Sequence, residues 1–421
     1  MTGVRPLRIL FAPETFNLGE TSRAVEVAKI VQAEGHDVLV MGYSRRFADY
    51  VREAGLHLRV LRPELSERDA DQLIAVDQGR ALRHPFTTTM VRERVASERA
   101  LIEQWRPDCV VIGTTLTLFI SARATGVPLA YVRPYAMSRR HLSQMTTFPL
   151  LAGRGPVAAR VNRSAARLVR TVVPAIRWKP ASFRRVAAEH SVRLPARTLD
   201  AVDADLNLLA SMAPFIGDQP LAAGEVAVGP VYARSSGDLP EQVSGFATSA
   251  RPAVYVGLGS SAGRRLALDV LMQLSEMDID VISSAGRYLT DNDRTHLPQN
   301  VTVHDFLPAH LLAGIIDASV IHGGEGTVQT ACASGVPFAG IGLQPEQRIN
   351  LEECVRYGNA IRFTARDIRS AELPLIVDRL LHDADLRRAA REIQSLARPV
   401  GAANSAAAIL DLARRSMHGD R

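Results

Sequence analysis

Short apolar runs that alternate with helical stretches are the feature that most constrains this fold. The run Leu7–Ala12 is followed by a helical pattern from about Ser22 to Glu34, where Val25, Ala28 and Val31 follow helical spacing. Such alternation predicts a parallel sheet with helices on both faces, so the first part of the chain reads as a Rossmann-like domain. Its other predicted strands are His36–Met41, Leu56–Leu61, Cys109–Gly113 and Leu129–Val132.

A second series of strands begins after the turn-rich stretch Gly229–Pro252 and predicts a second doubly wound domain. We place the first domain at residues 1–235, the second at 236–400, and a C-terminal helix returning to the first domain at 401–421. A ligand is expected in a cleft where the carboxyl ends of both sheets face each other. The predicted strands are Ala253–Leu258, Ile279–Ser283, Val301–Val303, Ser319–His322 and Val336–Ile341.

Length and composition support two packed domains. A chain of 421 residues is too long for one ordinary hydrophobic core, and with 47% hydrophobic and 22% charged side chains it is too apolar to be disordered. We find no apolar run long enough to span a membrane. Three cysteines, without metal-ligand spacing, suggest reduced thiols and a cytoplasmic location. The formal charge of +6 comes almost entirely from arginine, which we attribute to codon usage rather than to nucleic-acid binding.

The run His322-Gly-Gly-Glu-Gly-Thr327 follows a predicted strand directly and precedes a helical pattern through Ala333. Glycines at such a turn allow close approach of a ligand, and the free N–H groups of the helix start favour a phosphate. A glycine cluster alone is more often a tight turn than a ligand site. The geometry nevertheless predicts a diphosphate-binding turn when its surroundings agree.

The surroundings do agree, because a series of motifs resembles, in order and spacing, the donor-binding signature of family 1 glycosyltransferases. The resemblance covers residues 250–360 closely and the whole chain loosely, and points to bacterial natural-product enzymes. It implies a GT-B fold, an α/β architecture of two Rossmann-like doubly wound parallel-sheet domains facing across a cleft, with acceptor in the first and donor in the second. The motifs are Asp305-Phe-Leu-Pro308, Leu311-Leu312, His322–Thr327, Gly335-Val-Pro337, Pro345-Glu-Gln347 and Asn350.

The resemblance also assigns donor contacts residue by residue. It implies that Phe306 lies under the base and that the main chain of Leu307 reads the base edge. Thr330 stands where many plant relatives carry a ribose-binding Glu, and Ala309 where they carry Gln, so a dTDP sugar is as admissible as a UDP sugar. No cofactor or metal is implied. The remaining donor-site candidates are Gly259 and Ser260, then His322, Gly324, Gly326 and Thr327 for the diphosphate, and Glu346 and Gln347 for the sugar hydroxyls.

Inverting transfer needs a base that takes a proton from the acceptor. Most relatives carry a His after a Gly in the first loop, but this chain has Gly19-Glu20, which resembles the Gly-Asp of vancomycin-type glycosyltransferases. Glu20 is therefore the candidate base, with Glu14 as the second choice. The alternative is that Glu20 only interacts favourably with the dipole of the following helix.

Between Cys109 and Ala188 the chain carries no Asp or Glu, and Arg160, Arg163, Arg167 and Arg170 recur at helical spacing. They predict a basic amphipathic helix whose other face holds Val157, Val161, Ala165, Leu168 and Val172. Three interpretations stay open: an anionic acceptor, an anionic bilayer carrying a lipid acceptor, or solvent alone. The acceptor-region candidates are Arg139, Arg140, Arg160, Arg163 and Arg167.

We therefore expect an inverting glycosyltransferase that moves a sugar from a UDP or dTDP sugar to a small-molecule acceptor, a bacterial natural product. Inversion is expected because the paired glutamates of retaining enzymes are missing: Ala333 stands eight residues after Glu325. Three alternatives remain: a nucleotide-sugar 2-epimerase, a lipid-acceptor glycosyltransferase, and a non-catalytic homologue that acts as a partner subunit. The sequence does not address the oligomeric state.

Overall fold

Every strand in the described part of the chain belongs to one of two parallel sheets. The computed structural model describes residues 5–77, 86–151, 155–235, 237–259 and 262–417. It comprises an N-terminal unit, Met1–Ser211 with Ile216–Val231 and Val400–Arg421, and a C-terminal unit, Met212–Phe215 with Tyr232–Pro399. The chain passes between the units at 231–232 and 399–400, whereas the boundaries predicted from the sequence are 235–236 and 400–401. Residues 212–215 also belong to the C-terminal unit, which was not predicted from the sequence.

The sheet of the N-terminal unit has the strand order β3-β2-β1-β4-β5-β6-β7, so the winding reverses between β1 and β4. Its strands are β1 (Arg8–Ala12), β2 (Asp37–Gly42), β3 (Leu58–Val60), β4 (Cys109–Ile112), β5 (Leu129–Arg133), β6 (Leu206–Leu209) and β7 (Glu225–Ala227). Its helices are α1 (Leu18–Ala33), α2 (Ala48–Glu53), α3 (Glu67–Asp77), α4 (Thr88–Trp105), α5 (Leu118–Thr125), α6 (Arg139–Gln144), α7 (Pro156–Val172), α8 (Ala181–Glu189), α9 (Thr198–Ala201) and α19 (Gly401–Met417).

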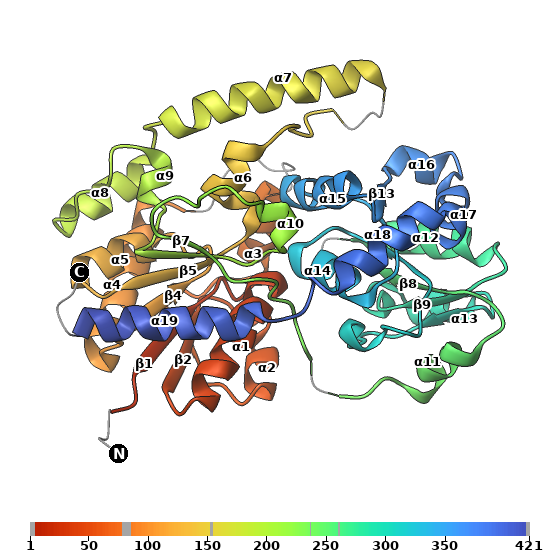
Figure 1. Cartoon of the computed structure of the whole chain (residues 1–421). Helices are drawn as coiled ribbons and strands as arrows, with labels where there is room; N and C mark the ends of the chain where they lie inside the picture. The colour runs from red at the N-terminus through yellow and green to blue at the C-terminus, as the bar shows by residue number, and fades with distance from the viewer. Residues whose placement is uncertain (1–4, 78–85, 152–154, 236, 260–261, 418–421) are drawn as a thin grey trace. The chain divides into compact units, whose positions relative to one another are not determined.

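Alternate residues of β1 enter opposite cores, as expected for a strand covered on both faces. Ile9 and Phe11 pack with side chains of α1 and α19, whereas Leu10 and Ala12 pack with those of α4 and α5. Figure 1 shows α19, in dark blue, lying along α1. The last helix of the chain therefore completes the core of the first unit.

The sheet of the C-terminal unit has the order β10-β9-β8-β11-β12-β13 and reverses between β8 and β11. Its strands are β8 (Ala253–Gly257), β9 (Asp280–Ser283), β10 (Val301–Val303), β11 (Ala318–Ile321), β12 (Phe338–Gly340) and β13 (Ala360–Arg362). The helices of this part are α11 (Glu241–Gly245), α12 (Arg264–Ser275), α13 (Asp291–Thr295), α14 (Glu325–Ser334), α15 (Pro345–Tyr357), α16 (Ala365–Arg369), α17 (Leu373–His382) and α18 (Ala384–Gln394), and α10 (Ala213–Ile216) lies at the passage between units. Both sheets thus have the doubly wound, Rossmann-like order.

Candidate functional site

Some of the candidate residues lie at the point where each sheet reverses its winding, which is where open α/β sheets bind ligands. In the C-terminal unit, Gly259 follows β8 and His322 follows the neighbouring β11. In the N-terminal unit, Glu14 and Glu20 follow β1, and Thr114 follows the neighbouring β4. Each unit therefore presents one set of candidate side chains at the carboxyl edge of its sheet.

The imidazole of His322 is buried between two glycines that leave no room for a side chain. A Cβ added to Gly259, whose φ is +60°, would lie 2.3 Å from the ring, and one added to Gly324 would lie 2.5 Å from Nε2. The Nδ1 atom lies 3.4 Å from the carbonyl oxygen of Gly257. Since a carbonyl only accepts, this contact places the proton on Nδ1. Burial lowers the pKa of His322 to about 4, so the ring is neutral at pH 7.

The glycine turn after His322 places the start of α14 at the same edge. Gly324 is the N-cap, and the first bond along the helix runs from the N–H of Val328 to the carbonyl of Gly324 at 2.9 Å. The first turn of a helix leaves N–H groups without intrahelical acceptors and has a partial positive charge. The backbone of Glu325, Gly326 and Thr327 is therefore suited to an anion such as a diphosphate.

Helix α15 fixes this turn from behind. The Nδ2 of Asn350 donates to the carbonyl of Gly323 at 3.2 Å. Gly323 has a φ of +86°, and a Cβ there would lie 2.8 Å from Leu351. The turn therefore requires glycine for both its conformation and its packing.

The predicted base-stacking residue lies on the surface after β10. The side chain of Phe306 is 52% exposed, an unusual position for a phenylalanine, whereas that of Leu307 is buried with Tyr255 and Ile282. Burial of Leu307 fixes the loop and leaves the neighbouring ring accessible to a planar ligand. The carbonyl of Gly259 accepts from the hydroxyl of Tyr288. Ser260, the remaining candidate in this group, lies outside the described residues.

Glu346 and Gln347 differ in their surroundings although they are adjacent. Gln347 is buried, and its Oε1 accepts from the N–H groups of Leu343 at 2.9 Å and Gln344 at 3.2 Å. The bond from the Gln344 N–H is one half of a capping box at the start of α15, and the other half is the Gln344 side chain accepting from the backbone N–H of Gln347. The Nε2 of Gln347 also donates to the Oε1 of Gln344 at 2.9 Å. Glu346, in the same first turn, is partly exposed. Of the two predicted sugar contacts, Glu346 is the more accessible.

Glu20 lies within the first turn of α1, so the predicted placement in the preceding loop is wrong. The Oδ1 of Asn17 caps the helix by accepting from the N–H groups of Gly19 at 2.9 Å and Glu20 at 3.3 Å. The Oε2 of Glu20 accepts from the N–H of Thr114 at 2.9 Å and from that of Glu14 at 3.2 Å, and its Oε1 accepts from the Thr114 hydroxyl. The carboxylate is thus held across the reversal point, between the loops after β1 and β4.

A buried ion pair behind Glu20 went unnoticed in the sequence. The Nη1 of Arg94 donates to the Oε1 of Glu14 at 2.6 Å, and both side chains are buried. The guanidinium also lies over the ring of Tyr43, 3.9 Å from its centroid. Burial raises the pKa of Glu14, which Arg94 opposes. Removing either partner would leave a buried charge, at a cost of roughly 3–5 kcal/mol, so the pair gives Glu14 a part in the stability of this unit.

The arginines of the predicted acceptor region fall into two groups. Arg139 bonds through Nε to Asp203 at 2.8 Å and through Nη2 to Asp200 at 2.7 Å. Arg140 is buried and donates from Nε to the carbonyl of Ile216 at 2.6 Å. These two arginines hold α6 to their own unit. Arg160, Arg163 and Arg167 are exposed on α7.

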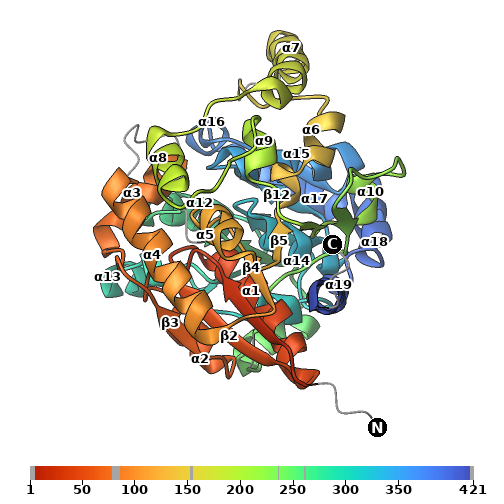
Figure 2. The same ribbon diagram turned by 90° about the vertical axis from the view of Figure 1, so that its left-hand side faces the viewer.

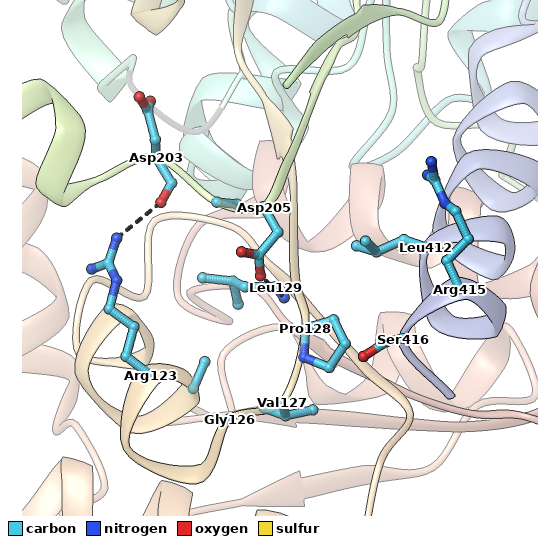
Figure 3. A pocket seen from close by; sticks show the side chains of 12 residues that line it. Arg123, Gly126, Val127, Pro128, Leu129, Asp203, Asp205, Leu412, Arg415 and Ser416 are labelled. Atoms are coloured by element: carbon cyan, nitrogen blue, oxygen red, sulfur yellow. Dashed lines mark hydrogen bonds between the residues drawn. The ribbon is translucent and has the colours of Figure 1, made fainter. Parts of the chain in front are cut away.

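A cavity of about 510 Å³ lies elsewhere in the N-terminal unit, at the amino ends of β5 and β6 (Figure 3). In Figure 3, Asp205, Pro128 and Ser416 are among the side chains around it. Arg123 donates to the carbonyl of Asp203 at 3.1 Å on one side of this cavity. Because ligands of doubly wound sheets bind at the carboxyl edge, we do not assign the cavity to the sugar-transfer site.

Two doubly wound units, one with a glycine turn at a helix start and one with a clamped carboxylate, match the architecture of GT-B glycosyltransferases. Residues 268–406 match the family described as erythromycin biosynthesis protein CIII-like, C-terminal domain. The 4'-demethylrebeccamycin synthase of Lentzea aerocolonigenes is 30% identical over 292 residues, 65% of this chain and 67% of that protein. The chain belongs to this family of GT-B natural-product glycosyltransferases.

Other known proteins share most of the length. A PGL/p-HBAD biosynthesis glycosyltransferase of Mycobacterium tuberculosis is 27% identical over 397 residues, covering 92% of this chain and 88% of its own. The spinosyn forosaminyltransferase SpnP superposes with a TM-score of 0.70 at 18% identity, over 97% of this chain and 99% of its own. The structure of the glycosyltransferase VinC in complex with dTDP superposes with a TM-score of 0.69 at 18% identity, over 97% of this chain and 100% of its own. No helix among the described residues is both long and apolar enough to cross a membrane.

Proposed function

We propose that this glycosyltransferase moves a sugar, with inversion, from a dTDP sugar to a small-molecule acceptor. The turn at His322 carries the proposal, because a buried neutral imidazole, two glycines without room for a Cβ and a helix start converge there. The backbone N–H groups of the helix start, together with the imidazole once binding has protonated it on Nε2, can stabilise the diphosphate as it becomes the leaving group. The names of the relatives, which refer to PGL/p-HBAD and 4'-demethylrebeccamycin, support a natural-product acceptor.

Glu20 is the base in this proposal. A carboxylate offers about four lone pairs, and the bonds from Glu14 and Thr114 use three of them. One lone pair on Oε1 is left to take the acceptor proton as the hydroxyl attacks the anomeric carbon. The Thr114 bonds fix the direction of that lone pair.

Thr330 favours dTDP over UDP as the nucleotide. Its hydroxyl donates to the carbonyl of Gly326 at 2.8 Å, within its own helix, at the place where plant relatives carry a ribose-binding Glu. A ribose 2'-hydroxyl thus finds no carboxylate at this position, which suits the deoxyribose of dTDP. Likeness to a dTDP complex supports the same choice.

We further propose that transfer needs no metal ion, since the N–H groups of α14 and an imidazole of His322 protonated on binding meet the diphosphate charge. As for the location of the protein, all three cysteines are free and buried, which supports a reducing, cytoplasmic setting. If transfer is independent of a metal ion, activity should survive treatment with a chelator. Loss of activity on chelation, with recovery on adding Mg²⁺, would contradict it.

The decisive experiment needs no known acceptor. Calorimetry with dTDP and UDP is expected to show tighter binding of dTDP, and a panel of dTDP α-sugars is expected to include one that is hydrolysed slowly. Early proton NMR spectra of the released sugar should then show the β-anomer first. Equal affinity for both nucleotides would contradict the donor assignment, and first release of the α-anomer would contradict inversion.

A further inference from the structure

Helix α7 buries only a narrow stripe of its surface. The buried side chains are those of Ala158, Asn162 and Ala166, which recur every fourth residue. Asn162 fixes the helix to the preceding segment by donating to the carbonyl of Leu151 at 3.0 Å and accepting from its N–H at 2.9 Å. In both views α7 stands clear of the sheet of its own unit (Figure 1 and Figure 2). Most of the helix is therefore open to solvent.

One exposed face of α7 is apolar. Val157 is 73% exposed and Leu168 64%, and Val172 is also exposed on the same side of the helix. Trp178, which follows the helix, is 70% exposed. Single exposed apolar side chains are ordinary, but a row along one helix marks an interaction surface.

The neighbouring face of α7 is basic. Arg160, Arg163, Arg167 and Arg170 are exposed at spacings of three and four residues. Within the described residues none of these four guanidinium groups forms an ion pair, and no Asp or Glu occurs between Cys109 and Ala188. Their charge is thus not neutralised by the protein itself.

We propose that α7, together with Trp178, is a docking surface for an anionic lipid bilayer. An apolar row beside an unpaired arginine row is the pattern of a helix that lies in a membrane interface. The exposed row is about 25 Å long at the helical rise, which suits an extended surface better than a small molecule. Trp178, which is followed by Lys179, would lie at the level of the lipid headgroups, where tryptophan side chains are favoured. The absence of acidic residues in this segment selects anionic over neutral lipid.

The test uses the full chain and vesicles of phosphatidylcholine with or without phosphatidylglycerol. Sedimentation is expected to give affinity on the order of 100-fold higher for the anionic vesicles, falling as salt is added. Leu168→Ser with Val172→Ser should weaken binding by about tenfold or more, and Arg163→Gln with Arg167→Gln should reduce the preference for anionic lipid. Tryptophan emission should shift to shorter wavelength with vesicles, and not in Trp178→Phe.

Matched controls lie on the C-terminal unit: Leu375→Ser, at a side chain 68% exposed, and Arg265→Gln, at one 96% exposed. Both should bind vesicles as wild type does, and dTDP affinity should be unchanged in every variant. Equal binding to both kinds of vesicle, or equal losses in the controls, would overturn the proposal. So would a dimer in sedimentation velocity that Leu168→Ser with Val172→Ser dissociates, because a second copy would then cover this face.

Discussion

The backbone N–H of Thr114 donates to the Oε2 of Glu20 at 2.9 Å, and the hydroxyl of the same threonine reaches Oε1. Thr114 follows β4 and Glu20 follows β1, the two strands between which the winding reverses. A Cβ added to Gly113 would lie 2.4 Å from the same carboxylate. The candidate base is therefore positioned by a loop almost a hundred residues away in the sequence.

Glu20→Gln is expected to lower turnover by roughly 10² to 10⁴-fold while leaving dTDP affinity unchanged. The amide keeps the size of the side chain but cannot take the acceptor proton. Single-turnover transfer across pH measures the effect, with circular dichroism as a control for folding. Near-wild-type turnover would make Glu20 only a favourable charge at the start of α1.

Thr114→Val should reduce turnover by about 10-fold or more, because a hydrogen bond to a charged group is lost while the backbone N–H bond remains. Thr114→Ser should restore most of it, since the hydroxyl returns. Comparison of the valine and serine variants distinguishes loss of the hydrogen bond that orients Glu20 from general damage to the loop. A serine variant as slow as the valine variant would argue against orientation by the hydroxyl.

Affinity for dTDP should rise as the pH falls from about 8 to about 5. Burial lowers the pKa of His322 to about 4 in the free protein, and a diphosphate beside the ring would raise it. Binding therefore takes up a proton between these two pKa values, and protonation favours the complex. Calorimetry in buffers of different ionisation enthalpy measures the uptake.

His322→Ala is the control, because dTDP itself also titrates. It should bind dTDP roughly 10- to 100-fold more weakly and with a shallower pH dependence. An identical pH dependence in both proteins would place the proton elsewhere.

The sequence predicted both doubly wound sheets because most of the strands from β1 to β5 and from β8 to β12 are dominated by apolar side chains. It missed β6, β7 and β13. Asn207 and Glu225 interrupt the apolar pattern of β6 and β7, and Val226 of the edge strand β7 is exposed. Short edge strands are held by the neighbouring strand rather than by their own pattern, so a single sequence gives little sign of them.

The start of α1 could have been predicted, and the ion pair behind it could not. Asn17 and Glu20 have the spacing of an N-cap and the third residue of a helix. Gly19 between them has low helix propensity, so the sequence pattern predicts the start of the helix too late, at about Ser22. Arg94 and Glu14 meet across 80 residues of sequence, and no local pattern encodes such a pair. On α7 the predicted basic helix is present, but its buried stripe is the small-residue row of Ala158 and Ala166.

Gln347→Ala should lower the stability of the C-terminal unit by about 1 kcal/mol, because it removes the capping box of α15. Glu346→Ala should leave stability unchanged and instead weaken binding of the dTDP sugar relative to dTDP. Thermal unfolding and paired calorimetric titrations measure the two effects. Equal loss of affinity for both ligands in Glu346→Ala would contradict its assignment to the sugar.

The last prediction concerns Glu98, which is fully buried on α4 and accepts hydrogen bonds from Tyr43 at 2.8 Å, Thr117 at 2.5 Å and Ser121. Burial raises its pKa from 4.5 to about 7. Between these values the folded protein holds a proton that the unfolded chain has released. The free energy of unfolding should therefore fall as the pH rises from about 4.5 to about 7, by on the order of 3 kcal/mol.

Glu98→Gln should remove this fall, because an amide in the same place does not titrate. Glu103→Gln, at an exposed position of the same helix, is the matched control and should follow wild type. Both tryptophans, Trp105 and Trp178, belong to the N-terminal unit, so their emission during urea unfolding reports on that unit alone. A wild-type stability that stays flat over this pH range would mean that Glu98 is ionised in the folded protein, stabilised by its three donors and by the nearby Arg94.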